Sequence, residues 1–267
     1  MTKIMMLGDT HGDAYAYEEA LIYADAVGIQ HIFVLGDLGV FPFYNDTLDY
    51  LERVNELSRD LGIQNYWVRG NHDDPDAWSA TVKYWPGTHR FGMLRSNIRL
   101  ADRVHHFKMF GLQFLAVGGA VSIDRNWRLN KESRAKTLYW PNETISDRDL
   151  NQVFTWESNG SRKVDVLLTH DCSDRTPFHT RLKEDLDSKI NRQKIDEILK
   201  VSEPDFHFHG HMHTEYEWAN RVSGSHYTQT YGLECNQDAM WPYPGETPNN
   251  WLIFDTEAKT TQWRLDS

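Results

Sequence analysis

Cysteine and long apolar stretches are both scarce in this sequence. Its 267 residues include two cysteines, Cys172 and Cys235, which are too few for a disulfide framework and fit a reducing compartment. No stretch approaches the roughly 18 consecutive apolar residues of a membrane span. The apolar stretch at residues 4–7 is too short for the hydrophobic part of a signal peptide. We therefore expect a soluble, cytoplasmic protein with no membrane partner.

Positive charge is also in short supply. The chain has 28 Lys and Arg residues against 39 Asp and Glu residues, which gives a net charge of −11 at pH 7. Non-specific affinity for nucleic acid comes from Lys and Arg side chains that neutralise phosphates, so we expect no long duplex nucleic acid as a partner. A small phosphate compound is compatible with the acidic charge, because a bound divalent cation reverses the local field.

Apolar residues are numerous enough for a large core. Hydrophobic residues make up 40% of the chain and aromatic residues 13%, and the length lies at the upper end for one domain. We predict a single domain over residues 1–267. The sequence leaves the oligomeric state open.

The first part of the chain alternates apolar and amphipathic segments. Stretches with the apolar character of buried strands occupy residues 4–7, 32–35 and 66–68. Apolar side chains recur at helical spacing over residues 13–27 and 48–61. This alternation predicts a parallel, right-handed βαβ arrangement. Ligands of such sheets gather at the carboxyl ends of the strands, so the polar residues that follow these strands are expected at one edge.

The second part of the chain changes character. The segments 104–110 and 112–117 predict a β-hairpin. Further elements are predicted at residues 146–156 (helix), 164–168 (strand), 182–201 (helix), 206–209 (strand), and 251–255 with 261–265 (a closing pair of strands). At about residues 122–160 we predict a cap-like excursion, because its basic first part carries more large aromatic residues than a linker does.

Five short polar motifs stand at the ends of the predicted strands. They read Gly8-Asp9-Thr10-His11-Gly12, Gly36-Asp37, Gly70-Asn71-His72-Asp73, Thr169-His170-Asp171 and Gly210-His211-Met212-His213. Carboxylate, imidazole and amide oxygen are the ligands preferred by divalent metals that activate water. One Asp or His after a strand is usually a turn former, whereas this many in one order predict a metal site.

The expected ligands are enough for two metal ions. They are Asp9, His11, Asp37, Asn71, His170, His211 and His213. Two metals about 3.5–4 Å apart need a bridging ligand, usually a carboxylate, and Asp37 is the natural bridge. A hydroxide shared by both ions would attack phosphorus in line, which predicts hydrolysis of a small phosphate ester. His72 is not needed as a ligand and is free to donate a proton to the leaving oxygen.

The order of these motifs resembles that of the calcineurin-like metallophosphoesterase superfamily, from Lys3 to about His213. The resemblance implies two ligand sets, Asp9, His11, Asp37 and His213 for one metal and Asp37, Asn71, His170 and His211 for the other. It also implies that His72 acts as the acid. The implied fold is an α/β, four-layer α-β-β-α sandwich of two mixed sheets flanked by helices. The implied cofactors are two divalent or trivalent ions such as manganese or iron.

One departure from the family pattern bears on the substrate. Protein phosphatases of this superfamily usually continue the second motif as Gly-Asp-x-x-Asp-Arg-Gly, whereas Gly36-Asp37 is followed here by Leu38-Gly39-Val40-Phe41. The Asp that would pair with the catalytic His and the Arg that would bind a monoester phosphate are both missing. We therefore predict a phosphodiesterase that acts on nucleotide or cyclic-nucleotide substrates.

Two alternative functions stay open. One is a broad phosphomonoesterase or protein phosphatase. The other is a non-catalytic, protein-binding scaffold on the same fold. Scaffolds of this kind can lose metal ligands or the catalytic histidine, and this chain loses neither.

Substrate contacts are sought in the excursion. The candidates are Arg125, Trp127, Arg128 and Trp140, since Arg matches phosphate and aromatic rings stack on bases. Solvated charge and cap packing explain these residues equally well. On the predicted hairpin, His105 and His106 are expected to be exposed. His207 and His209 are interpreted as ordinary strand histidines, with a role as partners of metal ligands as the alternative.

Overall fold

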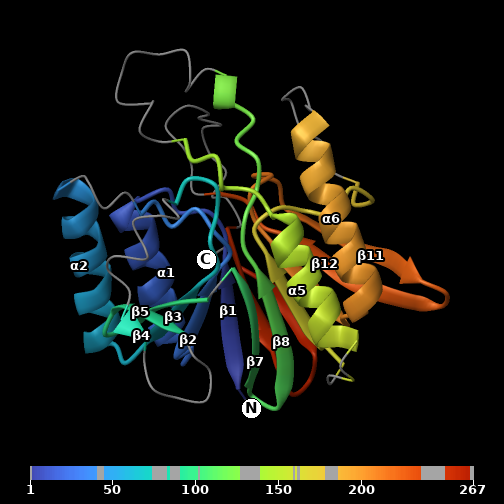
Figure 1. The fold of residues 1–267 in the computed structure, drawn as a ribbon. Coiled ribbons are helices and arrows are strands. Elements are labelled where there is room, and N and C mark those ends of the chain that lie inside the picture. Colours follow the sequence, from blue (N-terminus) through green and yellow to red (C-terminus); the bar gives the residue numbers. More distant parts are fainter. Residues whose placement is uncertain are drawn as a thin grey trace.

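The computed structural model describes residues 2–40, 45–73, 83–84, 91–101, 103–126, 139–158, 160, 163–177, 186–235 and 250–264. Two β-sheets pack face to face, and helices cover the outer face of each sheet (Figure 1). In this part of the chain, no helix has both the length and the apolar character needed to cross a membrane.

Within the described residues, the first sheet has eight strands in the order β14-β13-β1-β2-β3-β6-β5-β4. The strands are β1 (Lys3–Leu7), β2 (His31–Val34), β3 (Gln64–Trp67), β4 (Lys83–Tyr84), β5 (Gly92–Arg95), β6 (Ile98–Leu100), β13 (Trp251–Asp255) and β14 (Thr260–Trp263). As predicted, β1, β2 and β3 are parallel. They are connected by α1 (Ala14–Ala26) and α2 (Asn45–Asp60), so their carboxyl ends meet at one edge.

The second sheet, as far as the chain is described, has six strands in the order β11-β12-β10-β9-β8-β7. The strands are β7 (Val104–Met109), β8 (Leu112–Val117), β9 (Val166–Thr169), β10 (Phe206–His209), β11 (Tyr216–Ser223) and β12 (His226–Gly232). The predicted hairpin is confirmed as the antiparallel pair β7 and β8. Strands β8, β9 and β10 are parallel, and α5 (Asp147–Ser158) and α6 (Leu186–Ser202) cover the sheet.

The side-chain alternation of β1 shows how the core is divided between layers. Met5 and Leu7 belong to a buried cluster shared with α1 and α2. Ile4 and Met6 point to the other face, into a cluster shared with the second sheet. A third cluster, which includes Val153 of α5, lies between the second sheet and its helices. Three apolar interfaces between four layers confirm the α-β-β-α sandwich.

Part of the predicted excursion is described. Residues 127–138 lie outside the described part of the chain. At the far end of the excursion, α5 packs with α6 and β7, with Val153 fully buried. This helix therefore belongs to an outer layer of the sandwich, and only the residues before it are candidates for a cap.

The prediction that His105 and His106 are exposed is wrong. His105 is 5% exposed and its ring stacks on Phe91, with the centroids 4.4 Å apart. His106 stacks on Trp156 of α5 at 3.5 Å, and burial lowers its pKa to about 3. The two rings face opposite sides of β7, and each side is covered by a distant segment that local sequence does not reveal.

Candidate metal centre

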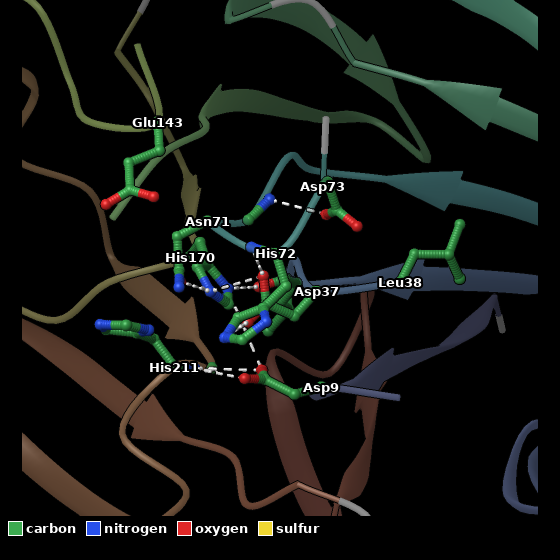
Figure 2. Close-up of polar contacts among 12 residues, drawn as sticks. Asp9, Asp37, Leu38, Asn71, His72, Asp73, Glu143, His170 and His211 are labelled. Atoms are coloured by element: carbon green, nitrogen blue, oxygen red, sulfur yellow. Dashed lines mark hydrogen bonds and ion pairs between the residues drawn. The ribbon is translucent and has the colours of Figure 1, made fainter. Parts of the chain in front are cut away.

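The predicted ligands converge at the edge where the carboxyl ends of the parallel strands of both sheets meet (Figure 2). The first sheet positions Asp9 and His11 after β1, Asp37 after β2, and Asn71 and His72 after β3. The second sheet positions His170 after β9, and His211 and His213 after β10. Residues up to 204 positions apart in sequence thus come into direct contact.

Side-chain donors form three overlapping groups among the described residues, and within each group the ligand atoms all lie within 4.8 Å of one another. The groups are Asp9, His11 and His213; Asp37, His170 and His211; and His11, Asp37 and His72. The first two match the division of ligands that the family resemblance implies. The third places His72, the expected acid, beside His11 and Asp37 of these two groups.

The distances show how closely the two main groups adjoin. His213 Nε2 lies 3.1 Å from Asp9 Oδ2 and 3.2 Å from His11 Nε2. In the other group, His170 Nε2 lies 3.3 Å from Asp37 Oδ1. His170 Nδ1 lies 4.0 Å from Asp9 Oδ1, so the two groups are in contact.

Contacts within the protein orient two side chains at the second group, those of His170 and Asn71. His170 Nδ1 donates a hydrogen bond to the Leu35 carbonyl at 2.7 Å, which directs Nε2 toward the site. Asn71 Oδ1 lies 3.0 Å from that Nε2, so the amide joins Asp37, His170 and His211. A metal-binding imidazole whose other nitrogen donates to a carbonyl is held in the correct orientation.

The turns that carry these residues have unusual backbone geometry. His11, Asp37, His211 and His213 have φ values of 47°, 46°, 64° and 47°, in the left-handed region. Such values are uncommon for residues other than glycine, and strain of this kind concentrates at functional sites. Here, hydrogen bonds from the backbone N–H groups of Thr10 and His11 to the Asp37 carbonyl, at 3.2 and 2.8 Å, tie the first two turns together.

Two motif glycines provide space for ligands from the opposite sheet. A Cβ on Gly36 would lie 2.0 Å from His170 Nδ1, and a Cβ on Gly210 would lie 2.1 Å from Asp9 Oδ1. No side chain other than hydrogen fits at either position. The glycine of each motif is therefore a packing requirement of the ligand that it faces.

The charges of the site are strongly coupled. Burial raises the pKa of Asp37, but His170 and His72 outweigh it and hold that pKa well below its ordinary value. Burial lowers the pKa of His170, but Asp37 and Asp9 outweigh it and raise that pKa to about 10. Two fully buried carboxylates are costly unless positive charge lies beside them. Carboxylate, imidazole and amide donors in this arrangement fit a pair of divalent cations.

Asp73 supports the centre without facing it. Its Oδ1 accepts hydrogen bonds from the Gly39 and Val40 N–H groups at 2.9 and 3.2 Å. Its Oδ2 accepts from the Gly70 N–H at 2.9 Å and from Trp67 Nε1 at 3.1 Å. Asp73 is therefore a loop anchor that joins the turn after β2 to the turn after β3.

The predicted substrate contacts are only partly described. Arg125 forms an ion pair with Asp187 of α6, with Nη1 2.5 Å from Oδ2. Trp140 is half-buried. Trp127 and Arg128 lie outside the described residues. Contact of these side chains with substrate stays a prediction.

Sequence reasoning missed two residues that are linked to the ligand set by hydrogen bonds. Ser122 Oγ accepts a hydrogen bond from Asn71 Nδ2 at 3.1 Å, and Glu143 in turn accepts from Ser122 at 2.8 Å. Ser122 and Glu143 are 21 positions apart and belong to no recognised motif. Only the folded structure, which brings Glu143 beside Ser122, relates them to the site.

Two mixed sheets between helices, with Asp, His and Asn donors at the strand ends, define a metallophosphoesterase fold. The calcineurin-like phosphoesterase family model matches the chain over residues 2–215. The chain belongs to this family, whose members hydrolyse phosphate esters at dinuclear metal sites. Hydrolysis of a phosphate ester is therefore its class of reaction.

Solved structures show the same fold at low sequence identity. A protein of Thermus thermophilus is similar with a TM-score of 0.56 and 13% identity, and the match covers 98% of each chain. A dimetal phosphatase from Danio rerio is similar with a TM-score of 0.58 and 12% identity, over 94% of this chain and 91% of that chain. No curated protein matches the sequence.

Proposed function

We propose that the protein is a dinuclear metal-dependent phosphodiesterase that acts on nucleotide or cyclic-nucleotide substrates. The observation that supports this best is the pair of adjacent donor groups, one around Asp9 and one around Asp37. They are in contact through the 4.0 Å approach of His170 Nδ1 to Asp9 Oδ1. A site for one metal ion would not need a second cluster of carboxylate and imidazoles beside the first.

The side chains divide between two ions, which we expect to be manganese or iron. One set is Asp9, His11, Asp37 and His213, and the other is Asp37, Asn71, His170 and His211. When bound, such ions supply a water molecule of lowered pKa and neutralise the oxygens of the phosphate. The protein's own contribution is to keep these side chains oriented before substrate arrives. Both cysteines are free thiols, in keeping with the proposed cytoplasmic location.

His72 is the proposed general acid. Its backbone N–H donates to Asp37 Oδ1 at 2.7 Å, and its Nε2 lies 3.9 Å from Asp37 Oδ2. The side chain is 27% exposed, whereas that of Asp37 is 1% exposed. His72 is therefore the more accessible of the two side chains, as a group that protonates the leaving oxygen must be.

The turn after β2 supports the proposed preference for a diester. Val40 stands where the protein phosphatases of the superfamily have the Asp that pairs with the catalytic histidine, and Phe41 stands in place of their Arg. Val40 is 4% exposed and belongs to the apolar core. The second negative charge of a monoester would meet no charged partner from these two positions.

The test is a comparison of two chromogenic esters with added Mn²⁺. We expect kcat/KM for bis(p-nitrophenyl) phosphate to exceed that for p-nitrophenyl phosphate by at least about tenfold, an effect of about 1.4 kcal/mol on the transition state. A strong preference for the monoester would overturn the diesterase assignment in favour of a broad phosphomonoesterase. Full occupancy by two ions without turnover of either ester would favour a scaffold.

The nucleotide assignment needs its own measurement. We expect the protein to hydrolyse 2′,3′- or 3′,5′-cyclic nucleotides to a nucleoside monophosphate. Chromatography of the products measures this reaction. Turnover of the chromogenic diester without turnover of any nucleotide would retain the phosphodiesterase and reject the nucleotide.

A further inference from the structure

A buried chain of hydrogen bonds leads away from Asn71 on the side opposite His170. Asn71 Nδ2 donates to Ser122 Oγ at 3.1 Å, and Ser122 Oγ donates to Glu143 Oε2 at 2.8 Å. The Ser122 backbone N–H donates to Glu143 Oε1 at 2.6 Å. Asn71, Ser122 and Glu143 are only 1%, 1% and 2% exposed. In Figure 2, the Glu143 side chain extends toward the part of the site that holds Asn71.

The direction of this chain is determined at its outer end. The Ser122 hydroxyl and backbone N–H both donate to Glu143, because in its ionised form the carboxylate has acceptors and no donors. Once its hydrogen is committed in this way, the Ser122 hydroxyl has only lone pairs left for Asn71. It can therefore accept from the Asn71 NH₂ group but cannot donate to the Asn71 oxygen.

The orientation of the Asn71 amide decides whether it can bind a metal. The oxygen and nitrogen ends of an amide have nearly the same shape, but only the oxygen has lone pairs for a cation. The Ser122 hydroxyl holds the nitrogen end, which leaves Oδ1 beside His170 Nε2 at 3.0 Å. A reversed amide would present N–H groups to the site and remove one ligand.

We propose that Glu143, acting through Ser122, is a positioning residue that orients the Asn71 amide oxygen toward the metal site. This inference rests on the proposed dinuclear function. It adds two residues to the site that none of the ligand motifs contains. It also explains why a carboxylate, that of Glu143, is buried inside the protein.

The backbone around Glu143 is anchored on both sides. The Ala120 N–H donates to the Glu143 carbonyl at 3.2 Å, and Arg103 Nη1 donates to the Asn142 carbonyl at 2.8 Å. On the other side, the Ile145 N–H donates to Asn191 Oδ1 at 3.0 Å. Groups that orient metal ligands act through such rigid surroundings.

The same segment is also linked to the second sheet. Asn191 of α6, which accepts from the Ile145 N–H, donates through Nδ2 to Asp171 Oδ2 at 2.8 Å. Asp171 directly follows His170 in the chain. The segment around Glu143 thus reaches two ligands of the same proposed metal ion, Asn71 through Ser122 and His170 through Asp171.

The chain offers a matched control far from the metal centre. Asn65 Nδ2 donates to Ser58 Oγ at 2.8 Å, and Ser58 Oγ donates to the Val54 carbonyl at 2.7 Å. Both Ser58 and Asn65 are fully buried. Ser58→Ala therefore removes the same kind of Asn–Ser contact as Ser122→Ala, next to an asparagine that is not a ligand.

The experiment is a Mn²⁺ titration by calorimetry of the intact protein and three variants. Glu143→Gln keeps the shape of the side chain but presents an NH₂ group to one of the two donors of Ser122. Ser122→Ala removes the hydroxyl. We expect each to weaken one of the two Mn²⁺ sites by about 10–100-fold, the usual effect of losing such a partner, and to leave the other site within about threefold. Ser58→Ala should lower the melting temperature and leave both sites unchanged.

The outcomes separate this inference from the proposed function. Two Mn²⁺ sites in the wild type that keep their affinities in both Glu143→Gln and Ser122→Ala would overturn the positioning role alone. A loss of Mn²⁺ affinity in Ser58→Ala as large as in Ser122→Ala would also overturn it, since general destabilisation would then explain the effect. Fewer than two Mn²⁺ sites in the wild type would overturn the dinuclear function itself.

Discussion

The two sheets contribute different chemistry to one site. The first sheet supplies every oxygen donor of the proposed ligand set, namely Asp9, Asp37 and Asn71, together with the imidazoles of His11 and His72. The second sheet supplies imidazoles alone, those of His170, His211 and His213. The buried negative charge therefore lies on one side of the interface between the sheets, and nitrogen donors lie on the other.

Neither sheet therefore makes the site by itself. The buried carboxylates of the first sheet rely on His170, whose approach to Asp37 and Asp9 accounts for the largest favourable shift in their pKa values. His170 in turn occupies the space left by Gly36. Metal binding should thus depend on the packing of the two sheets as much as on the identity of the ligands.

Asp37→Asn should have the largest effect, because Asp37 belongs to two of the donor groups and is the proposed bridge. We expect loss of at least one bound Mn²⁺ and a fall in turnover of roughly 10³-fold or more. Elemental analysis of the dialysed protein measures the metal content. Asp13→Asn is the matched control, since Asp13 caps α1 and Asn is an equally good cap. Unchanged metal content in Asp37→Asn would show that Asp37 is not the bridging ligand.

His72→Ala should reduce kcat by about 10²–10⁴-fold, the contribution of a general acid, while two Mn²⁺ ions stay bound. The His11, Asp37 and His72 group allows a different result. Loss of one ion in this variant would make His72 a ligand instead of the acid. Unchanged turnover would remove it from both roles.

Gly36→Ala tests the contact between the sheets directly. The new Cβ would displace His170, and the φ of 103° at position 36 adds backbone strain for any residue with a side chain. We therefore expect the free energy of unfolding to fall by several kcal/mol and one Mn²⁺ to be lost. Gly28→Ala is the control, because Gly28 has a φ of 76° and nothing within 4 Å of its Cβ position. It should cost only about 1–2 kcal/mol, the strain of a left-handed residue. Equal effects of the two variants in urea denaturation would contradict the packing argument.

The ion pairs between the sheets should also make the stability of the metal-free protein depend on pH. The pKa of His170 is raised from 6.5 to about 10, so its contribution to stability is complete below pH 6.5 and is lost as the pH rises through 10. Urea denaturation of chelator-treated protein should show a smaller free energy of unfolding at pH 10 than at pH 6.5. His170→Gln should reduce that difference, and an equal decline in the variant would assign it to other groups.

Much of this arrangement is readable from sequence because the ligands sit in short motifs. Asp9, His11 and Asp37 follow apolar strands directly, and parallel pairing brings strand ends together. Sequence periodicity likewise places the helices and the hairpin of β7 and β8. It is silent about the short strands β4 to β6. It is also silent about the hairpin of β11 and β12, because four of the eight residues of Tyr216–Ser223 are exposed, Trp218 among them.

What the sequence could not predict depends on contacts between distant segments. His105 and His106 look like exposed polar residues until Phe91 and Trp156 are seen to cover them. Ser122 and Glu143 are ordinary residues in a segment without periodicity. Their contact with Asn71 depends on the fold, which brings Glu143 beside Ser122 just after β8.

Anomalous diffraction from crystals soaked in Mn²⁺ would test most directly whether both sheets bind a pair of ions. We expect two peaks at the shared edge of the sheets, with a carboxylate oxygen of Asp37 contacting both ions. One ion should also be bound by His213 and the other by His170. A single peak, or two peaks with His170 and His213 turned away from them, would contradict a dinuclear centre assembled from both sheets.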